Sequence, residues 1–198
     1  RTTHPVTLIP GGFSWVPLKR QLRDMQDKLK ESVETLNDVA QIVLDNAHML
    51  PDFSRETEYI ALTSRDEYAI YDGDVGSTDT GTHPVDEYES IVNEFVVPYS
   101  TAKFTKHNRD SYMVGALARF NLNADQLSPM AKAWAEKFGL KPVNYNPFMN
   151  SVAQLIECVH STEDSIGLID RLLSGGYDTQ KICEDYKVKA GRGVGAVD

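Results

Sequence analysis

Cysteine is scarce in this chain of 198 residues, which contains only Cys158 and Cys183. The two residues do not form a C-x-x-C motif, and two cysteines are too few for the disulfide framework of a small secreted protein. We therefore predict that both are small buried hydrophobic residues in a reducing compartment. The chain offers no thiolate cluster for a metal ion.

A basic stripe and a long apolar run are missing as well. The sequence has 20 Lys and Arg residues against 29 Asp and Glu residues, which gives a formal net charge of −9. Because nucleic acids and anionic membranes bind basic surfaces, we expect neither as a partner. No apolar run approaches the roughly 18 residues that span a bilayer, and no signal peptide is visible, so we expect a cytoplasmic protein.

Complete catalytic motifs are also absent, since the sequence contains no G-x-S-x-G, H-E-x-x-H or P-loop pattern. The stretch GRGVG at 191–195 lacks the Lys-Ser/Thr pair that completes a phosphate loop. Asp72 and Asp74 flank a glycine and are typical of a turn, whereas a calcium site needs about six or more oxygen ligands. His83 and His160 are isolated histidines, which we interpret as a surface residue and a surface or core-edge residue. The residues alone predict no catalytic or metal site.

The sequence does contain clear helical periodicity. Apolar residues recur every three or four positions from Leu18 to Val43, which predicts a long amphipathic helix of about 17–47. A similar repeat predicts a second long helix of about 147–173. A third, shorter helix is expected from Ser128, because a hydroxyl residue followed by proline is a common helix start.

Strand patterns lie between the two long helices. The runs ETEYIALTS and DEYAIYDGDV, joined at 64–66, predict an antiparallel hairpin in the region of about 56–76. A short helix is expected near 86–95, and the apolar run at 111–122 fits either a strand or a helix. The predicted fold is α+β and helix-dominated, with two long amphipathic helices and small antiparallel β elements.

Four stretches, met in order along the whole chain, resemble one known family. They are HPVTLIPGG at 4–12, DFSRETEYIAL at 52–62, EFVVPYSTAKF with SYMVGALARFNLN at 94–123, and GRGVGAV at 191–197. Together they resemble the large, catalytic subunit of the [NiFe]-hydrogenases. Within that family they are most similar to the cytoplasmic, bidirectional branch that includes the NAD(P)-linked enzymes.

This resemblance implies a parent protein that catalyses the reversible oxidation of H2 to protons and electrons at a Ni–Fe centre. The implied partners are the remainder of the large subunit, an iron–sulfur small subunit and NAD(P)-linked subunits. In the family, two C-x-x-C motifs near the two ends of the large chain bind the metals, and neither motif occurs in these residues. We therefore expect a scaffold with no catalytic residue, no metal ligand and no cofactor of its own, which is inactive in isolation.

The stretch GRGVGAVD at 191–198, called the glycine segment below, is the subject of the remaining expectation from the resemblance. In the family it continues as Glu-Ala-Pro-Arg-Gly, and its arginine lies over the metal centre, whereas Asp198 stands here where the family usually has the glutamate. Arg192, Gly193 and Gly195 are thus expected near the Ni–Fe centre of the parent, with the glycines, Gly191 included, allowing close approach of the backbone. We expect Arg192 to pair with an acidic residue. Because the chain lacks an initiator Met and stops at this segment, we expect a central fragment of the large subunit.

Two alternatives remain. The first is a metal-free structural or assembly subunit that is related to the hydrogenases and has lost the thiolates. The second is an independent binding module, which requires native chain ends. The predicted first helix is longer than one small core requires, so we also expect the isolated chain to associate with itself.

Overall fold

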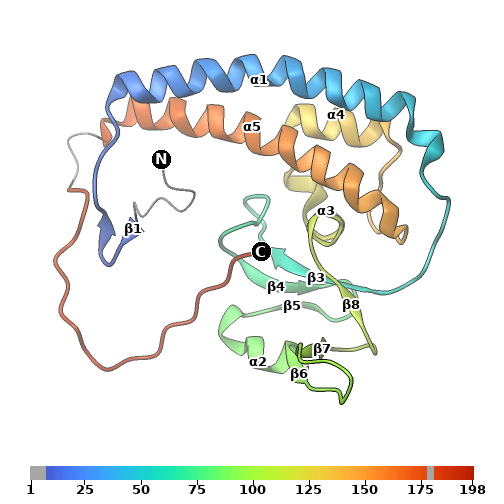
Figure 1. Cartoon of the computed structure of the whole chain (residues 1–198). Coiled ribbons are helices and arrows are strands. Elements are labelled where there is room, and N and C mark those ends of the chain that lie inside the picture. Colours follow the sequence, from blue (N-terminus) through green and yellow to red (C-terminus); the bar gives the residue numbers. More distant parts are fainter. Residues whose placement is uncertain (1–7, 178–180) are drawn as a thin grey trace. The chain divides into compact units, whose positions relative to one another are not determined.

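The computed structural model describes residues 8–177 and 181–198 and confirms a mixed, helix-dominated α+β fold (Figure 1). The chain divides into two compact units. Unit 1 is drawn from residues 1–35 and 161–192, and unit 2 from residues 36–160 and 193–198.

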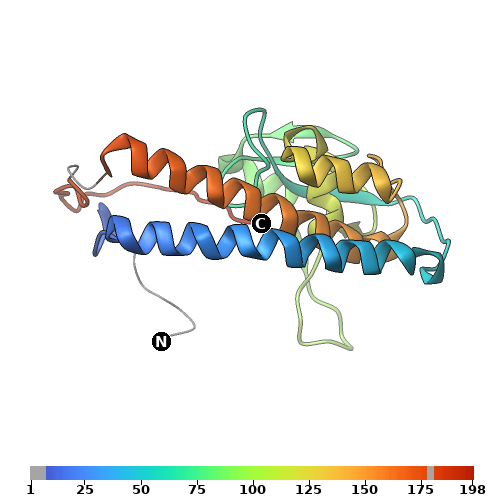
Figure 2. The ribbon, with the colours of Figure 1, turned by 90° about the horizontal axis from the view of Figure 1, so that it is seen from above.

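The long helices are α1 (Lys19–Asp45) and α5 (Asn150–Gly175), where the sequence predicts helices of about 17–47 and 147–173. In unit 1 the first part of α1 lies beside the last part of α5 (Figures 1 and 2). Gln26 of α1 is buried and donates a hydrogen bond of 2.6 Å to Asp170 of α5. This bond satisfies a polar group inside an otherwise apolar seam.

Unit 1 also contains a small hairpin formed by β1 (Leu8–Ile9) and β2 (Gly12–Phe13). Gly12 makes an isolated bridge with Cys183, and the Glu184 amide donates to the Gly11 carbonyl at 2.8 Å. A Cβ atom on Gly12 would collide with the Ile182 carbonyl, and its φ of +151° lies in the region that favours glycine. The glycine pair therefore permits close approach of the two segments.

The main sheet lies in unit 2 and has the strand order β5-β4-β3-β8. Its strands are β3 (Glu58–Thr63), β4 (Asp74–Ser77), β5 (Gly81–His83) and β8 (Tyr112–Met113). The β3–β4 and β4–β5 pairs are antiparallel and the β3–β8 pair is parallel. β3 is the central strand, and all of its residues except Thr63 are buried.

The predicted hairpin is correct in its first strand and wrong in its second. The sequence predicts the second strand on DEYAIYDGDV, but β4 begins only at Asp74, where it pairs with Thr63. Tyr68 and Ala69 are buried in an irregular stretch that precedes the strand. Their apolar character reflects packing into the core, which a short sequence run does not distinguish from strand pairing. Asp72, where the sequence predicts a turn, lies in a bend, and its carboxylate accepts a hydrogen bond from the Gly73 amide.

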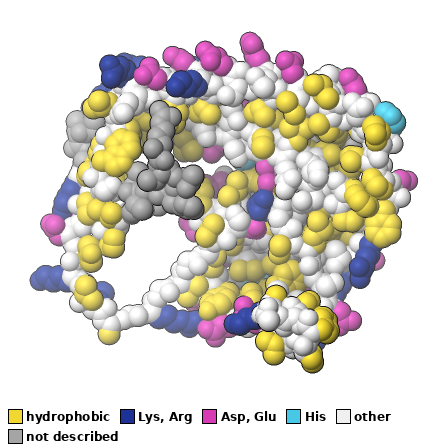
Figure 3. All heavy atoms as spheres, in the orientation of Figure 1, with side chains coloured by type: hydrophobic (Ala, Val, Ile, Leu, Met, Phe, Trp, Pro, Cys, Tyr) yellow, Lys and Arg dark blue, Asp and Glu magenta, His cyan; other side chains and the backbone are white. Residues whose placement is uncertain are grey.

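A second small hairpin corrects the short helix expected at 86–95. A 3-10 turn (Val85–Glu87) and α2 (Tyr88–Ile91) occupy the first part of that range. The chain then turns into β6 (Asn93–Phe95), which pairs with β7 (Phe104–Lys106). Hydrophobic side chains are prominent on this hairpin in Figure 3, whereas acidic side chains are scattered over the visible face of the molecule.

The core of unit 2 lies between the sheet and the helices. The apolar run at 111–122 contains both elements that the sequence allows, with β8 followed by α3 (Ala116–Asn123). The helix expected from Ser128 is α4 (Pro129–Lys137), and Gly139 follows it with a φ of +65°. Buried core side chains on α3, α4 and α5 include Leu117, Phe120, Trp134, Val152 and Ile156.

Candidate functional site

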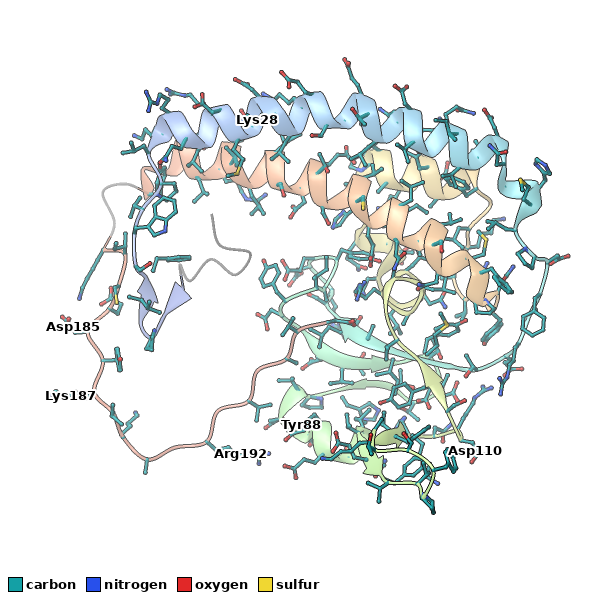
Figure 4. All side chains as sticks on the ribbon, in the orientation of Figure 1. Lys28, Tyr88, Asp110, Asp185, Lys187 and Arg192 are labelled. Atoms are coloured by element: carbon teal, nitrogen blue, oxygen red, sulfur yellow. The ribbon has the colours of Figure 1, made fainter. Side chains whose placement is uncertain are left out.

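The glycine segment has no regular secondary structure and little packing of its own. Gly191, Gly193 and Gly195 are exposed, and no atom lies within 4 Å of a Cβ built on any of them. Arg192 is exposed and takes part in an interaction, so it is not a free cation. Figure 4 shows Arg192 in this segment and Asp185 and Lys187 on the extended chain that precedes it. The glycines thus leave open space along the backbone.

The segment ends in a set of specific contacts at Asp198. One carboxylate oxygen accepts a hydrogen bond from the Leu62 amide on β3 at 3.0 Å. The other lies 2.7 Å from Nη1 of Arg119. The Asp198 amide in turn donates to the Ile70 carbonyl at 2.8 Å. Residues from α3, β3 and the bend before β4 therefore hold Asp198 in unit 2.

Arg119 is itself held in one orientation by Glu157 of α5. Its Nε and Nη2 atoms donate to the two carboxylate oxygens of Glu157 at 2.6 and 2.9 Å. This two-point contact is the geometry in which a guanidinium binds a carboxylate most strongly. The side chains of Arg119 and Glu157 are 15% and 13% exposed. Hydrogen bonding to Glu157 raises the pKa of Arg119 above its ordinary value and outweighs the opposing effect of burial.

Tyr68 completes this cluster. Its hydroxyl donates to Glu157 at 2.9 Å, and burial, followed by the negative charge of Glu157, raises its pKa well above the ordinary value. The tyrosine is therefore a neutral hydrogen-bond donor at physiological pH. We call Arg119, Glu157, Asp198 and Tyr68 the Arg119 cluster. It places one guanidinium between two carboxylates in a largely buried position.

His160 lies beside the Arg119 cluster as a structural residue. Its ring centroid is 4.9 Å from that of Tyr68, and its Nδ1 accepts a hydrogen bond from the Ser128 amide at the start of α4. The residue is 8% exposed, which places it in the core and not at the surface. His83 is half-buried and lies 2.8 Å from the Thr80 hydroxyl.

A second polar cluster joins the sheet to the chain after β7. Glu58 is fully buried and accepts hydrogen bonds from the Ser77 hydroxyl at 2.6 Å and the Asn108 amide at 3.1 Å. Nδ1 of His107 also lies 2.6 Å from its carboxylate. Nearby, Arg109 forms a two-point contact with Asp79. These contacts fix the loop at 107–109 against β3 and β4.

The cysteines do not provide a metal site, and neither of them is buried as predicted. Cys158 is exposed on α5 in place of the expected buried position. Cys183 is half-buried in unit 1, with its sulfur 3.6 Å from the Pro10 carbonyl. In the described parts of the chain, no three His, Cys, Asp or Glu residues converge in a way that would hold a metal ion. These residues therefore do not fit a Ni–Fe centre, which requires soft thiolate ligands.

Sequence reasoning identifies the segment that ends at Asp198 but not the residues that hold it. Arg119 stands out only as part of the motif SYMVGALARFNL, and Glu157 does not stand out at all. An arginine in a run of small and apolar residues is a signal for a buried ion pair, because a buried charge needs a partner. The identity of that partner, 79 positions away for Asp198, is not visible in the sequence.

Among the described residues, no helix has the length and apolar character needed to cross a membrane.

Comparisons with known proteins agree on one type of relative. The chain is 30% identical to the alpha subunit of sulfhydrogenase 1 from Pyrococcus furiosus and 28% identical to a subunit of the F420-non-reducing hydrogenase vhu from Methanocaldococcus jannaschii. It is also 26% identical to the alpha subunit of sulfhydrogenase 2 from Pyrococcus furiosus. Each alignment covers 100% of this chain but only 46%, 50% and 45% of the respective relative. The chain therefore spans about half the length of the curated relatives it matches.

No family profile matches the chain. The similarity to these three hydrogenase proteins nevertheless confirms the resemblance to a hydrogenase large subunit that the four sequence stretches indicate. It does not single out the NAD(P)-linked branch, which stays a prediction.

Proposed function

We propose that this chain forms the central scaffold of the large subunit of a nickel-dependent hydrogenase. The proposed activity of the parent is the reversible reaction H2 ⇌ 2H+ + 2e−. The similarity over the full chain to three hydrogenase subunits is the observation that carries this proposal.

The role proposed for residues 1–198 is to support the metal centre and not to bind it. We propose that the thiolate ligands of the parent belong to chain outside this sequence, and the lack of a group of three His, Cys, Asp or Glu residues among the described residues is compatible with this. The segment with Arg192, Gly193 and Gly195 is proposed to lie near that centre. Its open glycines and its firm attachment at Asp198 are compatible with a backbone that approaches another group closely. The isolated chain is expected to be inactive.

The proposed partners follow from the same similarity. All three relatives are named as single subunits of a hydrogenase or sulfhydrogenase, which supports a complex with further subunits. We propose the remainder of the large subunit, an iron–sulfur small subunit and NAD(P)-linked subunits as these partners, in the cytoplasm. The acidic net charge argues against nucleic acid, because phosphate binding requires a basic surface.

The intact gene and its product test this proposal. The expected result is two C-x-x-C motifs that flank this segment, an arginine a few residues after Asp198, and stoichiometric nickel in the purified protein. The purified protein should also reduce a redox dye with H2. An intact gene without the two motifs, whose product lacks nickel, would instead establish the alternative, a metal-free structural or assembly subunit.

A further inference from the structure

The last six residues of the chain are attached to unit 2 through a single residue. Among the described residues, 193–197 take part in no hydrogen bond or ion pair, whereas Asp198 takes part in three. Val197 is 79% exposed and no atom lies within 4 Å of a Cβ built on Gly193 or Gly195, whereas Val194 and Ala196 are half-buried. Within residues 193–198, the last part of the glycine segment, the hydrogen bonds and the ion pair that fix the position of the chain are therefore those of Asp198.

Two of the three contacts at Asp198 use backbone groups, and only Arg119 supplies a charge. Backbone groups of Leu62 and Ile70 align the chain, and the Leu62 amide donates to the charged carboxylate, but only Arg119 neutralises the charge of Asp198. The Asp198 side chain is 15% exposed, so solvent screens its ion pair only in part.

Glu157 fixes the orientation of the Arg119 side chain. Because Nε and Nη2 are both bound to the Glu157 carboxylate, the plane of the guanidinium is fixed and Nη1 faces Asp198. A lysine in this position would supply a charge without the planar fork and without a fixed direction. Removing the guanidinium would leave the carboxylates of Glu157 and Asp198 without the cation between them, which favours release of the segment.

From this geometry we infer that Arg119, oriented by Glu157, is a positioning residue that sets the place of the glycine segment for hydrogen activation. The inference rests on the proposed function, because it takes the glycine segment to lie at the reacting centre. Arg119 does not contact the reacting atoms itself. It acts through Asp198, so its loss should reduce turnover while the binding of H2 changes little.

The test uses the intact hydrogenase with Asp198→Asn, Arg119→Lys and Arg119→Met. Asp198→Asn removes the ion pair but leaves the Arg119–Glu157 contact in place, so it keeps the test valid if Arg119→Met fails to fold. Arg109→Met is the matched control, since it also removes a guanidinium paired with two carboxylates, Asp79 and Glu56, but does not touch the glycine segment.

We expect faster hydrogen exchange at the amides of 193–198 and Leu62 in Asp198→Asn and Arg119→Met, with little change in α3 and α5. We also expect kcat to fall by about 10²-fold, the scale that a small misplacement at a reacting centre produces, with KM for H2 nearly unchanged. Arg119→Lys should recover part of this loss. In a double-mutant cycle the effects of Asp198→Asn and Arg119→Met on kcat should be strongly non-additive, because both substitutions remove the same contact.

Unchanged exchange at 193–198 in both variants would overturn the anchoring role, and faster exchange with unchanged kcat would overturn the positioning role. A fall in kcat in Arg109→Met equal to that in Arg119→Met would also contradict the inference, because it would show a general effect of destabilisation. A wild-type protein without nickel or hydrogen activity would overturn the proposed function and the catalytic part of this inference together. The exchange measurement would still decide whether Arg119 anchors the segment.

Discussion

The carboxylate of Glu58, fully buried at the start of β3, lies 2.6 Å from Nδ1 of His107 in the loop after β7. The same carboxylate accepts from the Ser77 hydroxyl and the Asn108 amide. Burial raises the pKa of Glu58, but these hydrogen bonds together outweigh burial and hold the pKa below its usual value of 4.5. Glu58 is thus an ionised residue whose hydrogen-bond capacity the fold satisfies.

Replacing this carboxylate should weaken unit 2 in a pH-dependent way. Glu58→Gln is expected to lower the free energy of unfolding by about 2 kcal/mol at neutral pH, because buried donors lose a charged acceptor. A lowered pKa in the folded state stabilises the protein above the unfolded pKa, and this stability is lost as the pH falls through the folded pKa. The difference in the free energy of unfolding between wild type and variant should therefore reach its maximum above pH 4.5 and become smaller below it.

Denaturant unfolding at a series of pH values measures this difference. Glu56→Gln is the matched control, because Glu56 is 67% exposed and pairs with Arg109 at the surface. Its effect should stay below about 0.5 kcal/mol, as for other exposed ion pairs. A Glu58→Gln difference that is constant from neutral to acidic pH would show that the lowered pKa is wrong.

Tyr68 should remain protonated under conditions in which exposed tyrosines ionise. Burial and the neighbouring Glu157 raise its pKa above the usual value of 10, so the folded state favours the neutral hydroxyl. This contribution to stability is present at neutral pH and is lost as the pH rises through the folded pKa. In an ultraviolet titration, folded wild type and folded Tyr68→Phe should ionise the same number of tyrosines, and the two should differ by one only after unfolding. A difference of one between the folded proteins would contradict the raised pKa.

The same substitution has a stability consequence. Tyr68→Phe keeps the ring against His160 but removes the hydrogen bond to Glu157, which should cost about 1 kcal/mol. Tyr71→Phe is the matched control, because Tyr71 is 68% exposed. Thermal unfolding of both variants compares the two positions. Equal changes in Tm would argue against a special role for the Tyr68 hydroxyl.

The parts of the fold that follow from local chemistry were predictable from the sequence. The apolar period of three and four residues marks α1 and α5, and the Ser128–Pro129 pair with Gly139 marks the two ends of α4. Tyr68 and Ala69 misled the strand prediction, because burial in an irregular stretch produces the same apolar run as burial in a strand.

The candidate site was predictable only in part, because its contacts join distant positions. The glycine segment and Asp198 stand out through composition and resemblance. Their attachment to Arg119, and the link from Arg119 to Glu157 across 38 positions, depends on how α3 and α5 pack. A single sequence contains the charges but not their pairing. The resemblance to a hydrogenase is visible because several short motifs occur in the same order, which one motif alone would not establish.

Self-association of the isolated chain is expected, and the structure indicates a surface for it. The hairpin of β6 and β7 exposes Val96 and Tyr99, which are 75% and 82% exposed. Exposed apolar groups of this kind favour contacts between proteins. Sedimentation equilibrium of the 198-residue chain should show a concentration-dependent rise in mass, and Val96→Ser with Tyr99→Ser should reduce it. A monomer at every concentration would contradict the prediction.

A substitution at Gly193 distinguishes a structural role of the glycine segment from a functional one. No atom lies within 4 Å of the position that a Cβ would take, and its φ lies outside the positive range. Gly193→Ala should therefore change the free energy of unfolding of the isolated chain by less than about 0.5 kcal/mol, as at other surface positions.

The intact parent should respond differently to the same change. If the backbone at Gly193 approaches the Ni–Fe centre closely, an added methyl group meets atoms that the isolated chain lacks, and H2-dependent dye reduction falls. Val188→Ala provides a control on the same stretch, since Val188 is 94% exposed. An active Gly193→Ala enzyme with wild-type turnover would place the glycine away from the centre. Reduced turnover with unchanged stability of the isolated chain would show that this glycine serves the assembled enzyme and not the fold described here.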